Sequence, residues 1–237
     1  MRKALLSMAL LAGSLLSASA QTAADRVTAF VKPGPTQWLA IQLNNANAEY
    51  TAFQMDITLP ENLTFAGEVQ LKRQGTEAPH KAFFNEVDGV LKVVAFSAES
   101  YEGDATITKG NDIFSGTSGD LLLVKVTAAD GVVYKNIQLS VPEGESTAIG
   151  KVKFVNKDLN EVTMDAYVAG LLGDVNGDNR ISEQDASLVL QNAVGKIADN
   201  EEGYEVVVAN ANGDSKVSEQ DASLVLQYAV GKITSFE

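Results

Sequence analysis

Two twelve-residue stretches carry oxygen-bearing side chains at one regular spacing. The first runs from Asp174 to Asp185 and reads D-V-N-G-D-N-R-I-S-E-Q-D. The second follows thirty-six residues later, from Asn210 to Asp221, and reads N-A-N-G-D-S-K-V-S-E-Q-D. In both stretches these side chains fall at positions 1, 3, 5, 9 and 12, and a main-chain carbonyl is available at position 7. A calcium ion takes six to eight oxygens from such a loop. The spacing therefore predicts two Ca²⁺ sites.

The expected calcium ligands occupy equivalent positions in the two loops. They are Asp174, Asn176, Asp178, the carbonyl of Arg180, Ser182 and Asp185 in the first loop, and Asn210, Asn212, Asp214, the carbonyl of Lys216, Ser218 and Asp221 in the second. Position 6, where glycine usually permits a sharp turn, holds Asn179 or Ser215. Position 1 of the second loop is a neutral asparagine, so we expect the second site to be weaker. A single D-x-N-G-D segment could be simply a polar turn, but two copies favour the metal sites.

The loops belong to a longer duplication that includes a helix. Residues 173–197 and 209–233 align without a gap and are identical at 18 of 25 positions. In each copy a serine precedes an aspartate by three residues, as in a helix-capping box. Apolar residues then recur at helical spacing, and Gly195 or Gly231 suits the helix end. The buried stripe expected in the first copy consists of Ala186, Val189, Leu190, Ala193, Val194 and Ile197. No amphipathic helix precedes either loop, so the unit is loop–helix.

This loop–helix duplication resembles the dockerin type I module of cellulosome-type assemblies, over roughly Leu171 to Ile233. The resemblance implies calcium-dependent docking onto a cohesin-type protein module. That module could belong to the same chain, to a neighbouring copy or to a separate scaffold. In dockerin-like modules, loop positions 10 and 11 and the next outward turn meet the cohesin.

A leucine outside the expected stripe recurs in both helices beside the same polar residues. At 100° per residue, this leucine should point outward. We therefore expect two near-equivalent docking faces, which would let a partner bind in two orientations. The partner-binding residues expected are Glu183, Gln184, Ser187, Leu188 and Gln191, and their duplicates Glu219, Gln220, Ser223, Leu224 and Gln227.

The first twenty residues have the pattern of a secretory signal peptide. Arg2 and Lys3 precede an apolar core, and Ala18-Ser19-Ala20 is a cleavage-site pattern. The apolar stretch is too short to span a bilayer comfortably, and the alternative is a buried N-terminal helix. We expect residues 1–20 to be removed and the protein to be extracellular or at the cell surface, with no transmembrane segment.

The composition excludes several classes of function. The chain has no cysteine, which excludes disulfides, thiol catalysis and thiolate metal sites. Its net charge of −13 argues against nucleic acid as a partner, because phosphates need Lys and Arg. Residues 171–237 hold twelve acidic and four basic side chains, so most of the excess charge lies in the duplicated segment. Like charges crowd both loops, and we therefore expect folding and calcium binding to be coupled.

From Arg26 to Ala166 the pattern changes to short alternating segments separated by turn signals. Eight to ten strands without a convincing helix predict an antiparallel β-sandwich, and the whole chain is then mainly β with a small all-α C-terminal module. The strands expected are 26–31, 38–43, 53–59, 90–96, 120–127, 137–141, 151–155 and 162–166, with weaker candidates at 63–65, 69–72 and 81–84.

The segment Leu43–Phe65, L-N-N-A-N-A-E-Y-T-A-F-Q-M-D-I-T-L-P-E-N-L-T-F, resembles the early strands of cohesin modules. Cohesins are jelly-roll sandwiches related to some carbohydrate-binding modules; a fibronectin-like or other adhesin sandwich is the alternative. We therefore expect a cohesin-like domain at 21–168 and a dockerin-like domain at 169–237, joined through Met164–Leu172.

Catalytic motifs do not stand out in the sequence. The single histidine, His80, lies in the polar stretch E-A-P-H-K, where a solvated surface residue is expected. No G-x-S-x-G elbow, P-loop or H-E-x-x-H is present. Trp38 could stack on a sugar, although core or rim packing is the simpler role. We expect a secreted, non-catalytic assembly or adhesion protein. The alternative is a carbohydrate-binding protein or a dockerin-bearing, glycoside-active enzyme, for which polysaccharide would be the ligand.

Overall fold

The computed structural model describes residues 24–75, 79–97, 112–143, 146–214 and 216–236. The expected signal peptide, residues 1–20, lies outside the described residues, as does Ser215 of the second loop. We call residues 24–171 the sandwich and residues 172–236 the C-terminal module. No helix in the described part of the chain is long and apolar enough to cross a membrane.

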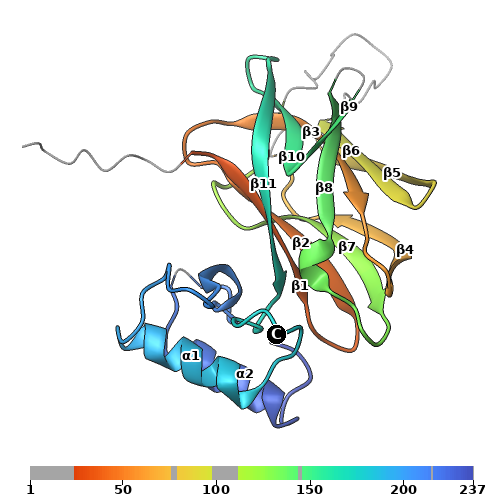
Figure 1. Ribbon diagram of the computed structural model, residues 1–237. Helices are drawn as coiled ribbons and strands as arrows, with labels where there is room; N and C mark the ends of the chain where they lie inside the picture. The colour runs from red at the N-terminus through yellow and green to blue at the C-terminus, as the bar shows by residue number, and fades with distance from the viewer. Residues whose placement is uncertain (1–23, 76–78, 98–111, 144–145, 215, 237) are drawn as a thin grey trace, which may run out of the picture.

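In the described residues, eleven strands and one short 3₁₀ turn, η1 (Tyr134–Asn136), form the sandwich (Figure 1). One layer has the order β4-β7-β2-β1-β11 and the other the order β11-β10-β3-β6-β5, so β11 belongs to both; β8 pairs with β3 and β9. The strands are β1 (Arg26–Lys32), β2 (Gln37–Asn44), β3 (Tyr50–Thr58), β4 (Leu63–Leu71), β5 (His80–Val87), β6 (Val90–Ser97), β7 (Asp120–Ala128), β8 (Gln138–Glu143), β9 (Ser146–Ile149), β10 (Lys151–Asn156) and β11 (Glu161–Leu171).

The sandwich core fills the space between the two layers. Successive strand residues point to opposite faces, so each strand contributes every second residue. Strand β6 shows this alternation over its whole length, with Leu91, Val93 and Ala95 buried between more exposed neighbours. The same cluster contains Leu39 and Ile41 of the other layer. The expected mainly β sandwich is confirmed.

Four details differ from the sequence-based expectation. The weak candidates 63–65 and 69–72 form one strand, β4, because a register shift between Phe65 and Val69 absorbs the extra residues. Strand β9 was not expected, and with it the count rises to eleven. Strands β1 and β11 pair in parallel, whereas the other pairs of described strands are antiparallel. The expected join, Met164–Leu172, is mostly strand, since β11 continues to Leu171.

The C-terminal module contains two α-helices of equal length, α1 (Glu183–Ala193) and α2 (Glu219–Ala229), and the 3₁₀ turn η2 (Val206–Val208). Both helices begin with the predicted capping box, formed by Ser182 with Asp185 and by Ser218 with Asp221. Gly195 follows the first helix with a φ of 72°, in the left-handed region that glycine adopts readily. The helices lie side by side beyond one end of the sandwich (Figure 1).

The module packs against its own sandwich through a second apolar cluster. Phe30, Ala40 and Leu123 point out of the sandwich layer that contains β1, β2 and β7, and they belong to the same cluster as Val189 and Val225 of the two helices. This explains why β1 is buried on both of its faces. The main chain also connects the two parts, because the Leu172 N–H donates to the Val31 carbonyl at 2.8 Å. The two parts therefore form one packed body.

His80 is buried at the start of β5, so the expectation of a solvated surface residue was wrong. Its ring stacks on Phe114, with ring centroids 4.1 Å apart. Nδ1 accepts from the Gly75 N–H at 2.9 Å, and Nε2 lies 3.1 Å from the Thr51 carbonyl, to which it donates. This arrangement requires a neutral imidazole, because a protonated Nδ1 could not accept a hydrogen bond. The residue has a structural role that its polar sequence neighbours do not reveal.

We expect acid to weaken the sandwich through His80. Burial lowers the pKa of His80 below its ordinary value, although hydrogen bonding to Thr51 and the nearby Asp112 raise it in part. The unfolded chain therefore binds the proton more readily than the folded chain. The contribution of the neutral ring to the free energy of unfolding is complete above the unfolded pKa of about 6.5 and is lost as pH falls below it. The loss is at most about 1.4 kcal/mol per pH unit. Between pH 7 and 5, the free energy of unfolding measured with denaturant should fall more steeply for the parent than for His80→Gln. Equal pH dependence of the two free energies would contradict the structural role of His80.

Candidate calcium loops and docking surface

The first loop is wrapped around the carboxylate at its position 1. Asp174 Oδ1 accepts from the N–H groups of Gly177 and Asp178 at 2.8 and 3.1 Å, and Oδ2 accepts from Asn179 N–H at 2.8 Å. Asn179, at position 6, has a φ of 67°, as expected for an asparagine that replaces the usual glycine. These local bonds set the curvature of the loop.

The carboxylate at position 12 closes the first loop onto its helix. Asp185 Oδ1 accepts from Val175 and Asn176 N–H, while Oδ2 accepts from the N–H and hydroxyl of Ser182. Asp185 is fully buried. Of the other expected ligands, the amide oxygen of Asn176 accepts from Asp178 N–H at 3.0 Å, and Asp178 Oδ1 accepts from Arg180 N–H at 2.9 Å. Hydrogen bonds within the loop therefore link position 12 to position 9, position 3 to position 5, and position 1 to the main chain of positions 4 to 6.

The second loop repeats this pattern except at position 1. Asp221 accepts from Asn212 N–H and from the N–H and hydroxyl of Ser218, and Asp214 accepts from Lys216 N–H. At position 1, Asn210 donates through Nδ2 to the Asp214 carbonyl at 2.6 Å. Its Oδ1 is buried and accepts no hydrogen bond from any residue that the structure describes. A buried oxygen without a partner is costly, and a cation beside it would satisfy it.

The chemistry of both loops fits calcium. Burial raises the pKa of Asp174, and the neighbouring Asp185 and Asp178 add to this, while the N–H donors of Asn179 and Gly177 lower it. Such crowding of buried carboxylates is relieved by a hard cation that accepts oxygen ligands. Within the described ranges no three or more His, Cys, Asp or Glu side chains converge on one point. The amide, hydroxyl and main-chain oxygens would therefore have to complete each shell, and the ligand set remains a prediction.

The outer helix faces differ from the expectation at one residue of each repeat. Leu188 and Leu224 are half-buried and pack against the cluster shared with the sandwich, so they do not stand outward. The exposed leucines are instead Leu190 (45% exposed) and Leu226 (43% exposed). Leu188 and Leu190 lie 100° to either side of the buried Val189, so helical periodicity alone could not distinguish them. The other expected partner-binding residues are exposed, except that Gln191 and Gln227 are half-exposed and donate back to Ser187 and Ser223.

These corrections give each repeat an outer face with an apolar centre. In the first repeat, Leu190 and the exposed Val194 lie beside Ser187 and Glu183; in the second, Leu226 and Val230 occupy the equivalent positions. The sequence placed these apolar residues in the core, so it missed the strongest surface feature of the module. The run Leu188-Val189-Leu190 could have revealed them, because three consecutive apolar residues cannot all lie on the buried side of a helix.

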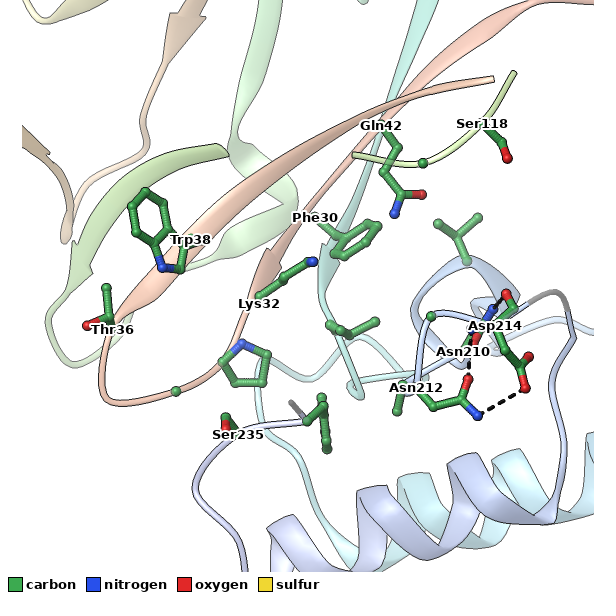
Figure 2. A pocket seen from close by; sticks show the side chains of 18 of the residues that line it. Phe30, Lys32, Thr36, Trp38, Gln42, Ser118, Asn210, Asn212, Asp214 and Ser235 are labelled. Atoms are coloured by element: carbon green, nitrogen blue, oxygen red, sulfur yellow. Dashed lines mark hydrogen bonds between the residues drawn. The ribbon is translucent and has the colours of Figure 1, made fainter. Parts of the chain in front are cut away.

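A cleft of about 590 Å³ lies between the second loop and the sandwich (Figure 2). Its walls come from β1, β2 and the turn between them, from the second loop and from the C-terminal segment that contains Ser235. In Figure 2, Lys32 and Gln42 lie between Trp38 and the polar residues of the loop. Trp38 is half-buried and packs on the shared cluster, and Lys125 Nζ lies 6.0 Å from its ring centroid. Packing therefore accounts for Trp38, as the simpler expectation had it.

The opposite side of the sandwich carries an exposed apolar patch that the sequence analysis did not single out. Phe83 of β5 and Phe96 of β6 stack with centroids 5.4 Å apart and an interplanar angle of 19°. Val87 and Val94 are exposed on the same two strands. Lys92, nearby on β6, pairs with Asp56 at 2.7 Å. Apolar residues at both odd and even positions of 80–96 could have signalled a strand pair with two apolar faces.

Comparison with known proteins identifies the C-terminal module. The family model of the Dockerin type I domain matches residues 172–229, which include both loops and both helices. This match agrees with the dockerin resemblance of the duplicated segment. A search of the curated proteins gave no match.

Several solved cohesin structures are similar to the N-terminal part of the chain. A cohesin of scaffoldin B from Acetivibrio cellulolyticus is 15% identical over 63% of this chain and 99% of that chain, with a TM-score of 0.40. The cohesin module of a family 33 glycoside hydrolase from Clostridium perfringens is 12% identical over 62% and 99%, with a TM-score of 0.38. A non-cellulosomal cohesin from Archaeoglobus fulgidus is 15% identical over 62% and 91%, with a TM-score of 0.35.

Proposed function

We propose that the protein is a secreted, non-catalytic assembly protein whose C-terminal module docks onto a cohesin-type module in the presence of two calcium ions. The observation that carries this proposal is the pair of matching outer faces on α1 and α2, each following a loop built for a cation. The proposed division of the chain is a signal peptide at 1–20, a cohesin-like domain at 21–168 and a dockerin-like domain at 169–237.

The contacts between the C-terminal module and its own sandwich favour docking onto a separate chain. The inner sides of α1 and α2 share an apolar cluster with Phe30, Ala40 and Leu123, whereas Leu190 and Leu226 remain exposed. The side of the module that contacts its own sandwich is thus already used, and the outer faces are available to another molecule. We therefore propose that the partner is a cohesin-type module on a separate chain.

Capture of cohesins by the full chain tests this function. The protein from residue 21 onward, mixed with individual type I cohesin modules, should bind at least one of them with 1 mM calcium and lose that binding in excess chelator. A chain with both loops disabled, Asp178→Ala with Asp214→Ala, serves as the control, because both residues are exposed expected ligands. Binding that persists equally in chelator, or that the control retains, would contradict calcium-dependent docking.

A further inference from the structure

The first calcium loop contacts the sandwich at η1, the turn that precedes β8. The Tyr134 N–H donates to Oδ1 of Asn179 at 3.2 Å. Tyr134 is held firmly, because its ring is buried in the sandwich core and its hydroxyl accepts from Gln37 Nε2 at 3.4 Å. Asn179 is the residue that stands at position 6 in place of the usual glycine. Its side chain thus has a partner outside the module, which a glycine could not provide.

Lys135, the next residue of η1, lies along the same loop. A Cβ at Gly170 would be 3.2 Å from Lys135 Cγ, and a Cβ at Gly177 would be 2.9 Å from Lys135 Nζ. Two glycines therefore leave room for this one side chain, and its ammonium group reaches position 4 of the first loop. The second loop differs, because a Cβ at the equivalent Gly213 would meet no atom of the described residues within 4 Å.

The ammonium group of Lys135 has no directly paired carboxylate among the described residues. Its positive charge therefore acts on the loop as a whole. It reduces the repulsion among the loop carboxylates when no ion is bound, and it repels a divalent cation entering the same loop.

We propose that Lys135 and Asn179 are positioning residues that couple the first calcium site to the sandwich. Lys135 lowers the calcium affinity of this site, and the bond from Tyr134 N–H to Asn179 holds η1 against the calcium-loaded loop. The inference rests on calcium binding as proposed above. It also bears on the relative calcium affinities of the two sites. The first loop has a carboxylate at position 1 that the second loop lacks, which favours calcium binding at the first site. Of the two loops, however, only the first has a lysine beside its position-4 glycine, and this charge opposes that advantage.

The test of Lys135 is a calcium titration of the full chain from residue 21 onward. Asn212→Ala with Asp214→Ala disables the second loop, so that the remaining signal reports the first. In this background Lys135→Met should raise calcium affinity roughly three- to tenfold at low ionic strength, and the gain should shrink in 1 M salt. The matched control is Lys72→Met, which removes an equal charge from an exposed lysine of the sandwich and should change affinity less than twofold.

The test of Asn179 is hydrogen exchange at the Tyr134 amide. Asn179→Gly keeps the left-handed turn but removes the acceptor, so the calcium-induced protection of this amide should fall at least tenfold while the rest of the sandwich core is unchanged. Unaltered affinity in Lys135→Met, or unaltered Tyr134 exchange in Asn179→Gly, would overturn the inference while leaving calcium binding intact. A parent chain that binds no calcium would instead overturn the proposed function.

Discussion

Chelation of calcium is expected to unfold the C-terminal module and lower the thermal stability of the whole chain. Asp174, Asp185 and Asp221 are buried carboxylates in the two loops, and Asn210 Oδ1 is buried without a hydrogen-bond partner among the described residues, so a bound cation is expected to stabilise both loops. Each site saturated at 100 times its Kd would add about 2.7 kcal/mol, or about 5 kcal/mol for two sites. Because the module shares an apolar cluster with β1, β2 and β7, part of this loss should reach the sandwich.

Circular dichroism and thermal melting of the full chain measure this effect. Excess chelator should remove most of the helical signal of α1 and α2, and added calcium should restore it. Magnesium at the same concentration should restore little, because it gives up its water reluctantly and demands a strict octahedral geometry. A chain that keeps its helices and its melting temperature in chelator would contradict coupled folding and binding.

Docking should tolerate the loss of either outer helix face but not of both. Leu190 and Leu226 are equivalent residues of two repeats that are identical at 18 of 25 positions, so one face can replace the other after a half-turn of the partner. A charge placed at the apolar centre of a docking face is expected to disrupt it. Leu190→Asp alone and Leu226→Asp alone should each weaken cohesin binding by only a few-fold, and the double variant should weaken it at least about 100-fold.

Calorimetric titration of the cohesin that the full chain captures provides this measurement. Leu159→Asp is the matched control, since Leu159 is 67% exposed on the sandwich and lies outside the docking faces. The double variant should still bind calcium as the parent does, which separates lost docking from lost folding. If one single variant abolishes binding, the two faces are not equivalent; if the double variant binds normally, the faces are not the docking surface.

Local features of the module could be predicted from the sequence because short-range contacts determine them. The capping boxes of Ser182 and Ser218, the left-handed Asn179 and the glycine after α1 all depend on residues within one loop and one helical turn. The alternation of strands such as β6 likewise follows from the side-chain period of two. These features specify the fold class and the candidate calcium sites.

Features that depend on distant residues could not be predicted. His80 is buried because Phe114 and Thr51, more than 25 residues away in the chain, cover and bond it. Leu188 packs inward because the apolar cluster shared with the sandwich lies on its side of α1, whereas Leu190 lies on an exposed side of the same helix. The parallel pairing of β1 with β11 joins the two ends of the sandwich sequence. Sequence periodicity carries no information about such partners.

The most direct test of calcium-dependent docking by this module is the calcium content of the full chain. Isothermal titration of calcium into the metal-free protein from residue 21 onward should give two bound ions per chain, and Asp178→Ala with Asp214→Ala should abolish most of that binding. The account predicts that cohesin binding and occupancy of these two sites rise together as calcium is added. A parent chain that binds no calcium, or that docks fully before any calcium is bound, would contradict it.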